Sequence, residues 1–140
     1  MTGMLDSNII IYHLMSNHPE HSPASSNLFR NVRLGEIDVY CPSTAILECT
    51  YILSRTFGAP RDEIAPLLGD IISISGVHCE HKPALLKSLV FWQRNPPLDF
   101  ADCYHLALAR ELGITQVYTF HKKMDRYPGV ERIEPEAANV

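Results

Sequence analysis

Short apolar runs alternate along this chain with longer segments that have helical periodicity and helix-capping residues. Strands are expected at 4–5, 37–41, 74–79, 114–120 and 130–133, and helices after the Asp6-Ser7-Asn8 cap, at 23–34, after a Ser43 or Thr44 cap to 56, at 61–72, at 83–94, and from an Asp99 cap to 112. When strands alternate with helices, the connections are crossovers and neighbouring strands become parallel. The pattern therefore predicts an α/β fold with a largely parallel sheet and helices on both of its faces.

The length and charge of the chain limit its organisation and its partners. A chain of 140 residues has the size of one domain, so we expect a single domain over residues 1–140. Sixteen acidic against twelve basic residues give a formal net charge of −4. This balance excludes a protein that holds nucleic acid through bulk positive charge. Any nucleic-acid binding needs a local basic patch on an acidic body.

The cysteines and the N-terminal segment bear on the cellular compartment. The four cysteines show no CxxC spacing and lie in apolar segments, which favours buried, reduced thiols over a zinc site. No Lys or Arg precedes Arg30, unlike in a signal peptide. No apolar run approaches the roughly 18 residues that span a bilayer. We therefore expect a cytoplasmic protein with no membrane partner.

Two acidic residues stand out because of their surroundings. Asp6 follows the first expected strand, where it could cap the next helix, although Ser7 or Asn8 could cap that helix equally well. Glu48 is the only charged residue in 39–54, within a mostly apolar helix. Its carboxylate is expected to be desolvated unless it meets a cation, and exposure on a narrow polar stripe is the structural alternative.

Asp99 and Asp102 lie one helical turn apart on one face of an expected helix. A capping role for Asp99 and a favourable helix dipole for Asp102 would explain both without any chemistry.

Taken together, these acids come from separate crossover units, at places where α/β sheets bind ligands. Converging carboxylates repel one another unless a divalent cation neutralises them, and an all-oxygen pocket suits Mg²⁺ or Mn²⁺ better than zinc. The set predicts metal-assisted attack of water on a phosphodiester, with Asp6 and Asp102 sharing the cation.

Four segments in order resemble the motifs of the PIN-domain family, and most closely those of VapC-type ribonuclease toxins: Leu5–Tyr12, Pro42–Glu48, Leu98–Asp102 and Val117–Phe120. The resemblance implies a three-layer α/β/α fold, Mg²⁺- or Mn²⁺-dependent cleavage of RNA, and neutralisation by a small antitoxin protein. It matches Asp6, Glu48 and Asp102 to the first three acidic positions of the family, Asp99 to the accessory acid and Ser7 to the small hydroxyl residue. We also expect a homodimer.

The chain departs from this family pattern after its last long strand. The family usually has Thr-Phe-Asp there, whereas this chain has Thr119-Phe120-His121. His121 could ligate the metal or hold a water molecule, or Asp125 could replace the missing acid. The second metal site could instead be absent, with His121 an ordinary surface histidine.

Basic residues follow this position, and other functions compete with cleavage. Lys122, Lys123 and Arg126 are expected to contact the substrate, although a solvated charge run is an equal alternative. The leading alternative function is an RNA- or protein-binding module with a degenerate metal site. A haloacid-dehalogenase-like phosphatase is disfavoured because Asn8 stands where its second Asp is required.

Overall fold

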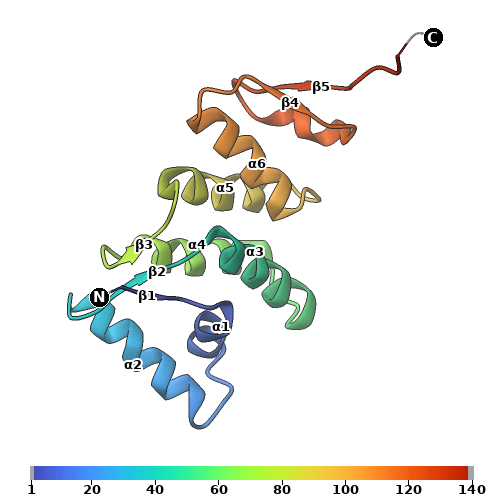
Figure 1. Cartoon of the computed structure of the whole chain (residues 1–140). Helices are drawn as coiled ribbons and strands as arrows, with labels where there is room; N and C mark the ends of the chain where they lie inside the picture. Colours follow the sequence, from blue (N-terminus) through green and yellow to red (C-terminus); the bar gives the residue numbers. More distant parts are fainter. Residues whose placement is uncertain (1, 139–140) are drawn as a thin grey trace. The chain divides into compact units, whose positions relative to one another are not determined.

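The computed structural model describes residues 2–138, which form two compact units that divide after Lys82. Figure 1 shows the ribbon coloured along the chain, with the first unit in blue to green. None of the helices in the described range is long and apolar enough to span a membrane.

The N-terminal unit contains a three-stranded parallel sheet in the order β1-β2-β3. In this sheet Gly3 pairs with Val39, and Val39 pairs with Val77. The elements of this unit are β1 (Thr2–Met4), α1 (Ser7–Met15), α2 (His21–Arg33), β2 (Asp38–Tyr40), α3 (Ser43–Tyr51), η1 (Ile52–Thr56), α4 (Arg61–Ile72) and β3 (Val77–His78). Helices in every connection make each pairing a crossover, which is why the strands run parallel.

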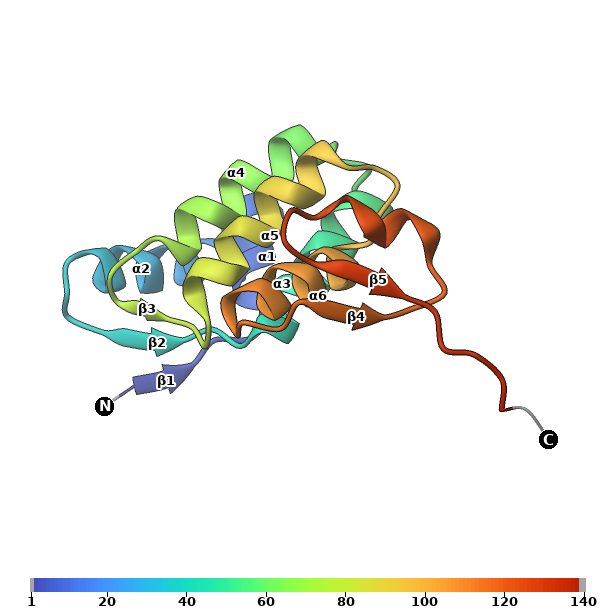
Figure 2. The same ribbon diagram turned by 90° about the horizontal axis from the view of Figure 1, so that it is seen from above.

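The C-terminal unit contains a two-stranded parallel sheet, β4-β5, whose crossover connection carries a short 3-10 helix. Figure 2 shows these two strands side by side. The elements are α5 (Lys82–Arg94), α6 (Phe100–Glu111), β4 (Gln116–Tyr118), η2 (Lys122–Arg126) and β5 (Glu131–Ile133).

These observations confirm the predicted α/β class with parallel strand pairing. The strand expected over 114–120 is shorter, because the Ile114 amide donates to the Ala109 carbonyl and still belongs to the end of α6. The strand therefore starts only at Gln116.

The predicted cap of the third helix is wrong. Pro42, with extended backbone angles, occupies the N-cap position of α3, and Ser43 is already helical. The helix then widens into the π-helical turn η1. Here the Thr50 hydroxyl donates to the Leu47 carbonyl at 2.7 Å and the Ser54 hydroxyl donates to the Thr50 carbonyl at 2.6 Å, and such side-chain bonds compete with the regular helical ladder.

Each unit has its own apolar interior. In the N-terminal unit the fully buried side chains include Leu5, Ile10, Ile46, Leu68 and Ile72, and in the C-terminal unit they include Leu85, Leu89, Leu98 and Leu106. Three of the four cysteines are buried and Cys79 is half-buried, and all four are free thiols, as the sequence predicts.

The buried Gly76 provides a test of the packing. A Cβ there would lie 2.9 Å from Val32 Cγ1 and 3.2 Å from the Ile37 carbonyl oxygen, so Gly76→Ala is expected to reduce the free energy of unfolding by about 1–3 kcal/mol. Gly69, inside α4, has open space where a Cβ would be added, so Gly69→Ala is expected to raise the free energy of unfolding by about 0.5–1 kcal/mol. Urea unfolding of both variants measures the difference, and equal effects would contradict the packing of Gly76.

Candidate active site

Asp6 lies where the first strand passes into α1. It occupies the N-cap position with extended backbone angles, but its side chain makes no capping hydrogen bond. The side chain is exposed. The Asp6 carboxylate therefore does not cap α1, which was the structural alternative. The acid is free for another use.

The negative charges of Glu48 and Asp6 both act on one buried thiol. Cys49, next to Glu48 on α3, places its Sγ 3.8 Å from the carbonyl oxygen of Ser7, the first residue of α1. Burial, followed by the negative charges of Glu48 and Asp6, raises the pKa of the Cys49 thiol to about 12. The N-terminal unit thus places both predicted acids within electrostatic reach of the Cys49 thiol.

The expectation that Glu48 is desolvated is wrong. The Glu48 side chain is exposed, as are Leu47 and Tyr51 on the same part of α3. The apolar residues of this helix therefore do not all face the interior, and an apolar run alone could not reveal that. Arg55 does not ion-pair with Glu48 in the structure described. Its guanidinium lies 6.0 Å from the centroid of the Tyr51 ring.

Ser7, which matches the small hydroxyl residue of the family, lies inside the N-terminal unit. Ser7 is buried, with 5% of its surface exposed, and its carbonyl oxygen accepts a hydrogen bond from the Cys49 thiol. In this arrangement Ser7 connects the start of α1 to α3.

In the C-terminal unit, Asp99 and Asp102 lie at the start of α6. Asp99 is the N-cap, as predicted, but its side chain makes no capping hydrogen bond, and Asp102 lies in the first turn. The positive end of the helix dipole favours both negative charges at this position. The helix thus holds two carboxylates one turn apart.

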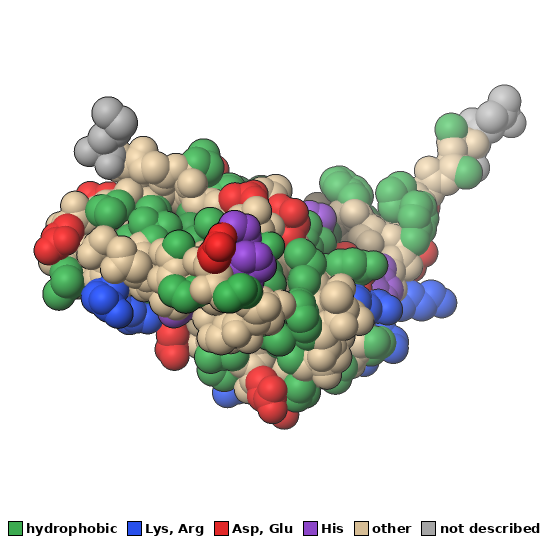
Figure 3. Space-filling view, turned by 90° about the horizontal axis from the view of Figure 1, so that it is seen from below, with side chains coloured by type: hydrophobic (Ala, Val, Ile, Leu, Met, Phe, Trp, Pro, Cys, Tyr) green, Lys and Arg blue, Asp and Glu red, His purple; other side chains and the backbone are tan. Residues whose placement is uncertain are grey.

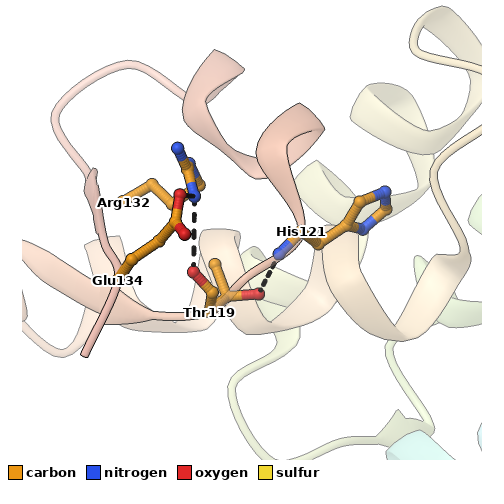
Figure 4. Close-up of polar contacts among 4 residues, drawn as sticks. All are labelled: Thr119, His121, Arg132 and Glu134. Carbon is orange, nitrogen blue, oxygen red and sulfur yellow. Dashed lines mark hydrogen bonds and ion pairs between the residues drawn. The ribbon is translucent and has the colours of Figure 1, made fainter. Parts of the chain in front are cut away.

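His121 contacts one of these acids. Its Nδ1 lies 3.1 Å from Asp102 Oδ2, and both side chains are partly exposed to solvent. The backbone N–H of His121 donates to the Thr119 hydroxyl oxygen at 3.0 Å. Figure 4 shows that the imidazole points away from Thr119 and from the Arg132–Glu134 ion pair. If Nδ1 carries the proton and donates it to Asp102, Nε2 is left with a lone pair for a proton, a water or a metal.

The other predicted residues of this unit lie on η2. Lys122, Lys123, Asp125 and Arg126 are all exposed. Figure 3 shows where Lys and Arg side chains gather beside histidines on one face of the molecule. Asp125 makes no contact with His121 or Asp102 among the hydrogen bonds and ion pairs of the described residues.

Thr119 was not singled out by the sequence. Its hydroxyl fixes the backbone of His121, and its carbonyl lies 3.5 Å from Arg132 Nη1. A Thr hydroxyl can accept a hydrogen bond from the amide two residues later and close a turn, but Thr does so more weakly than Asn or Asp, so the sequence carries only a weak signal.

The donor chemistry of the two pairs fits a hard divalent cation. Across residues 2–138, no three His, Cys, Asp or Glu side chains are grouped closely enough to hold a metal ion. Mg²⁺ does not need such a cage, because proteins bind it through one or two carboxylates together with water and substrate phosphate oxygens. Asp6 with Glu48 is a pair of this kind, and Asp99 with Asp102 is another.

Comparison with known families gives the class of the protein. Residues 3–130 match the PIN domain family, so this chain belongs to it. PIN domains are typically metal-dependent nucleases that act on RNA. No curated protein matches the chain significantly.

The thiols test the surroundings of the first acidic pair. A hydrogen bond from the Cys41 thiol lowers the pKa of Cys79, and the charge of Lys82 adds to this effect. With a pKa of about 12, only about one Cys49 thiol in ten thousand is ionised at pH 8. Iodoacetamide should therefore label Cys79 first and Cys49 far more slowly. Peptide mass spectrometry over time measures the order, with Cys79→Ser as the control that removes the fast label.

Proposed function

We propose that this protein is a metal-dependent endoribonuclease that hydrolyses RNA phosphodiester bonds with Mg²⁺ or Mn²⁺. The observation that carries the proposal is that two exposed carboxylates, Asp6 and Glu48, both act electrostatically on one thiol in a chain of the PIN domain family. Neither carboxylate is used as a helix cap or in an ion pair within the described residues. Exposed like charges held close together favour the binding of a cation.

In this proposal Asp6, Glu48 and Asp102 hold the cation, and Asp99 is the accessory acid. The bound cation would lower the pKa of a water molecule and stabilise negative charge on the phosphate. Asp6 is positioned by the turn from β1 into α1, and Asp102 by the first turn of α6. Ser7, Lys122, Lys123 and Arg126 are proposed to act on the substrate side of the site.

His121 is proposed to work through Asp102. The 3.1 Å contact orients the imidazole, so that Nε2 can hold or accept a proton from a water molecule. This role replaces that of the acid which the family usually has at this position. It leaves the second metal site weaker than in a chain with a fourth carboxylate.

We further propose that the protein is the toxin of a toxin–antitoxin pair, acts as a homodimer in the cytoplasm, and is neutralised by a small antitoxin protein. The support for this is the motif resemblance over most of the chain. Copurification of the chain with the product of the neighbouring reading frame tests this part of the proposal. The alternative, a binding module with a degenerate metal site, predicts no cleavage with either metal.

Removal of the first acid tests the reaction. Asp6→Asn is expected to lower Mn²⁺-dependent RNA cleavage by about 10²-fold or more, since metal charge stabilisation contributes several kcal/mol to the transition state. Glu48→Gln and Asp102→Asn should show losses of the same kind. Asp70, an exposed aspartate on α4, provides the matched control Asp70→Asn. Unchanged cleavage by Asp6→Asn would rule out the assignment.

Substitution at position 121 tests the histidine role. His121→Ala is expected to weaken cleavage, because Asp102 loses the imidazole that contacts it. His121→Asp restores a carboxylate and is expected to strengthen activity with Mg²⁺ relative to Mn²⁺, because imidazole is a poorer ligand for the harder ion. Asp125→Asn is the comparison for the other candidate. If Asp125→Asn is as damaging as Asp6→Asn while His121→Ala is silent, Asp125 holds the role.

A further inference from the structure

A groove on the C-terminal unit is basic, although the chain as a whole is acidic. It has a volume of about 620 Å³ and is formed by α5, α6, η2 and the residues that follow η2. Four of its ten lining residues are cations, and none is acidic: Lys87, Arg94, Arg110 and Arg126. In a chain with a net charge of −4, this is the local basic patch that nucleic-acid binding requires.

One face of α5 forms a wall of the groove. Lys87, Val90, Phe91 and Arg94 have the spacing that places side chains on the same side of a helix. Lys87 and Arg94 are exposed and seven residues apart, which is about 10.5 Å along the helix axis. Two cations at this separation suit a ligand with a row of regularly spaced charges better than a single small anion.

Arg110 is held across the groove by a specific backbone arrangement. Its Nη1 donates to the Pro128 carbonyl at 2.9 Å. Gly129 has a φ of +82°, and a Cβ at this residue would collide with the Arg110 guanidinium. Because a guanidinium has five N–H donors, this single bond leaves others for phosphate oxygens.

Two aromatic rings complete the groove. The Phe91 and Tyr127 rings meet edge to face with centroids 4.9 Å apart. Burial raises the pKa of the Tyr127 phenol, against the opposing effect of Arg110, so the hydroxyl remains a neutral donor. Cations beside aromatic rings are the usual composition of single-stranded nucleic-acid sites.

We propose that this groove binds the phosphate backbone of single-stranded RNA on the unit that carries Asp102 and His121. The inference rests on the proposed ribonuclease function and deepens it by naming where the substrate strand lies. Asp102 and Arg110 are on the same helix, eight residues or about 12 Å apart along its axis. The helix η2 likewise connects His121 to Arg126. An acidic peptide would also neutralise the cations of the groove. RNA is favoured because the same two helical elements carry both groove residues and predicted site residues.

The test is binding without cleavage. Fluorescence anisotropy in EDTA measures the affinity for a labelled oligouridylate of about ten nucleotides. The logarithm of the binding constant should fall linearly with the logarithm of salt concentration, with a slope of about −0.7 for each phosphate contact. The double variant Lys87→Gln/Arg94→Gln should bind more weakly, with a slope reduced in magnitude by about 1.4. Circular dichroism confirms that the variant is folded.

The matched control removes the same charge elsewhere. Arg30 and Arg33 are exposed in the last turn of α2, and Arg30→Gln/Arg33→Gln should leave the slope unchanged. An equal effect of both double variants would overturn the proposal in favour of general charge attraction. Competition by a glutamate decapeptide at the same affinity would overturn it in favour of a protein partner. Because EDTA prevents cleavage, the binding assay is independent of the cleavage assay. Failure to bind RNA would contradict the groove proposal without contradicting the catalytic proposal, and binding by a chain that cannot cleave RNA would contradict only the catalytic proposal.

Discussion

The parallel hydrogen bonding of β1 to β2 is the constraint on which the first acidic pair depends. The Leu5 amide donates to the Tyr40 carbonyl at 2.8 Å, one residue beyond the end of β1. The chain leaves the sheet only after this bond, and Leu5 itself is buried. Asp6 therefore emerges at the carboxyl end of its strand with an extended backbone, before α1 begins. A shift of one residue in this register would turn the side chains of the strand to the opposite face.

The second link is the contact between α1 and α3. Cys49 is buried against the start of α1, so the charges of Glu48 and Asp6 both act on its thiol although the two acids lie far apart in the sequence. The small thiol allows this close approach. The cost of bringing two carboxylates together is limited here by their exposure, because solvent screens exposed charges. Without a bound cation, an exposed acidic pair of this kind therefore lowers the stability of the fold only a little.

In the C-terminal unit, a hydrogen bond of modest strength orients the side chain of His121. The His121–Asp102 contact joins side chains that are 44% and 25% exposed, and exposed ion pairs contribute little to stability. Its value is orientation, since it fixes which nitrogen of the imidazole faces the carboxylate. The same unit carries the basic groove. Helix α6 therefore holds Asp102 in its first turn and Arg110, which lines the groove, in its last turn. A chain with a net negative charge thereby has one basic groove that attracts a polyanion.

The sequence by itself determined the order and type of nearly all elements, the parallel pairing, and the placement of Asp6 and Asp99 at helix starts. The elements and the helix starts depend on neighbours within a few residues, where periodicity, caps and turn residues act, and the parallel pairing follows from the helical crossovers between the strands. Only the tertiary structure decided that Glu48 is exposed, that His121 contacts Asp102, and that Arg110 and Arg94 border the same groove as Arg126. Each of these depends on which helix or strand lies next to the residue in space. That proximity is set by packing between distant segments, and no local pattern encodes it.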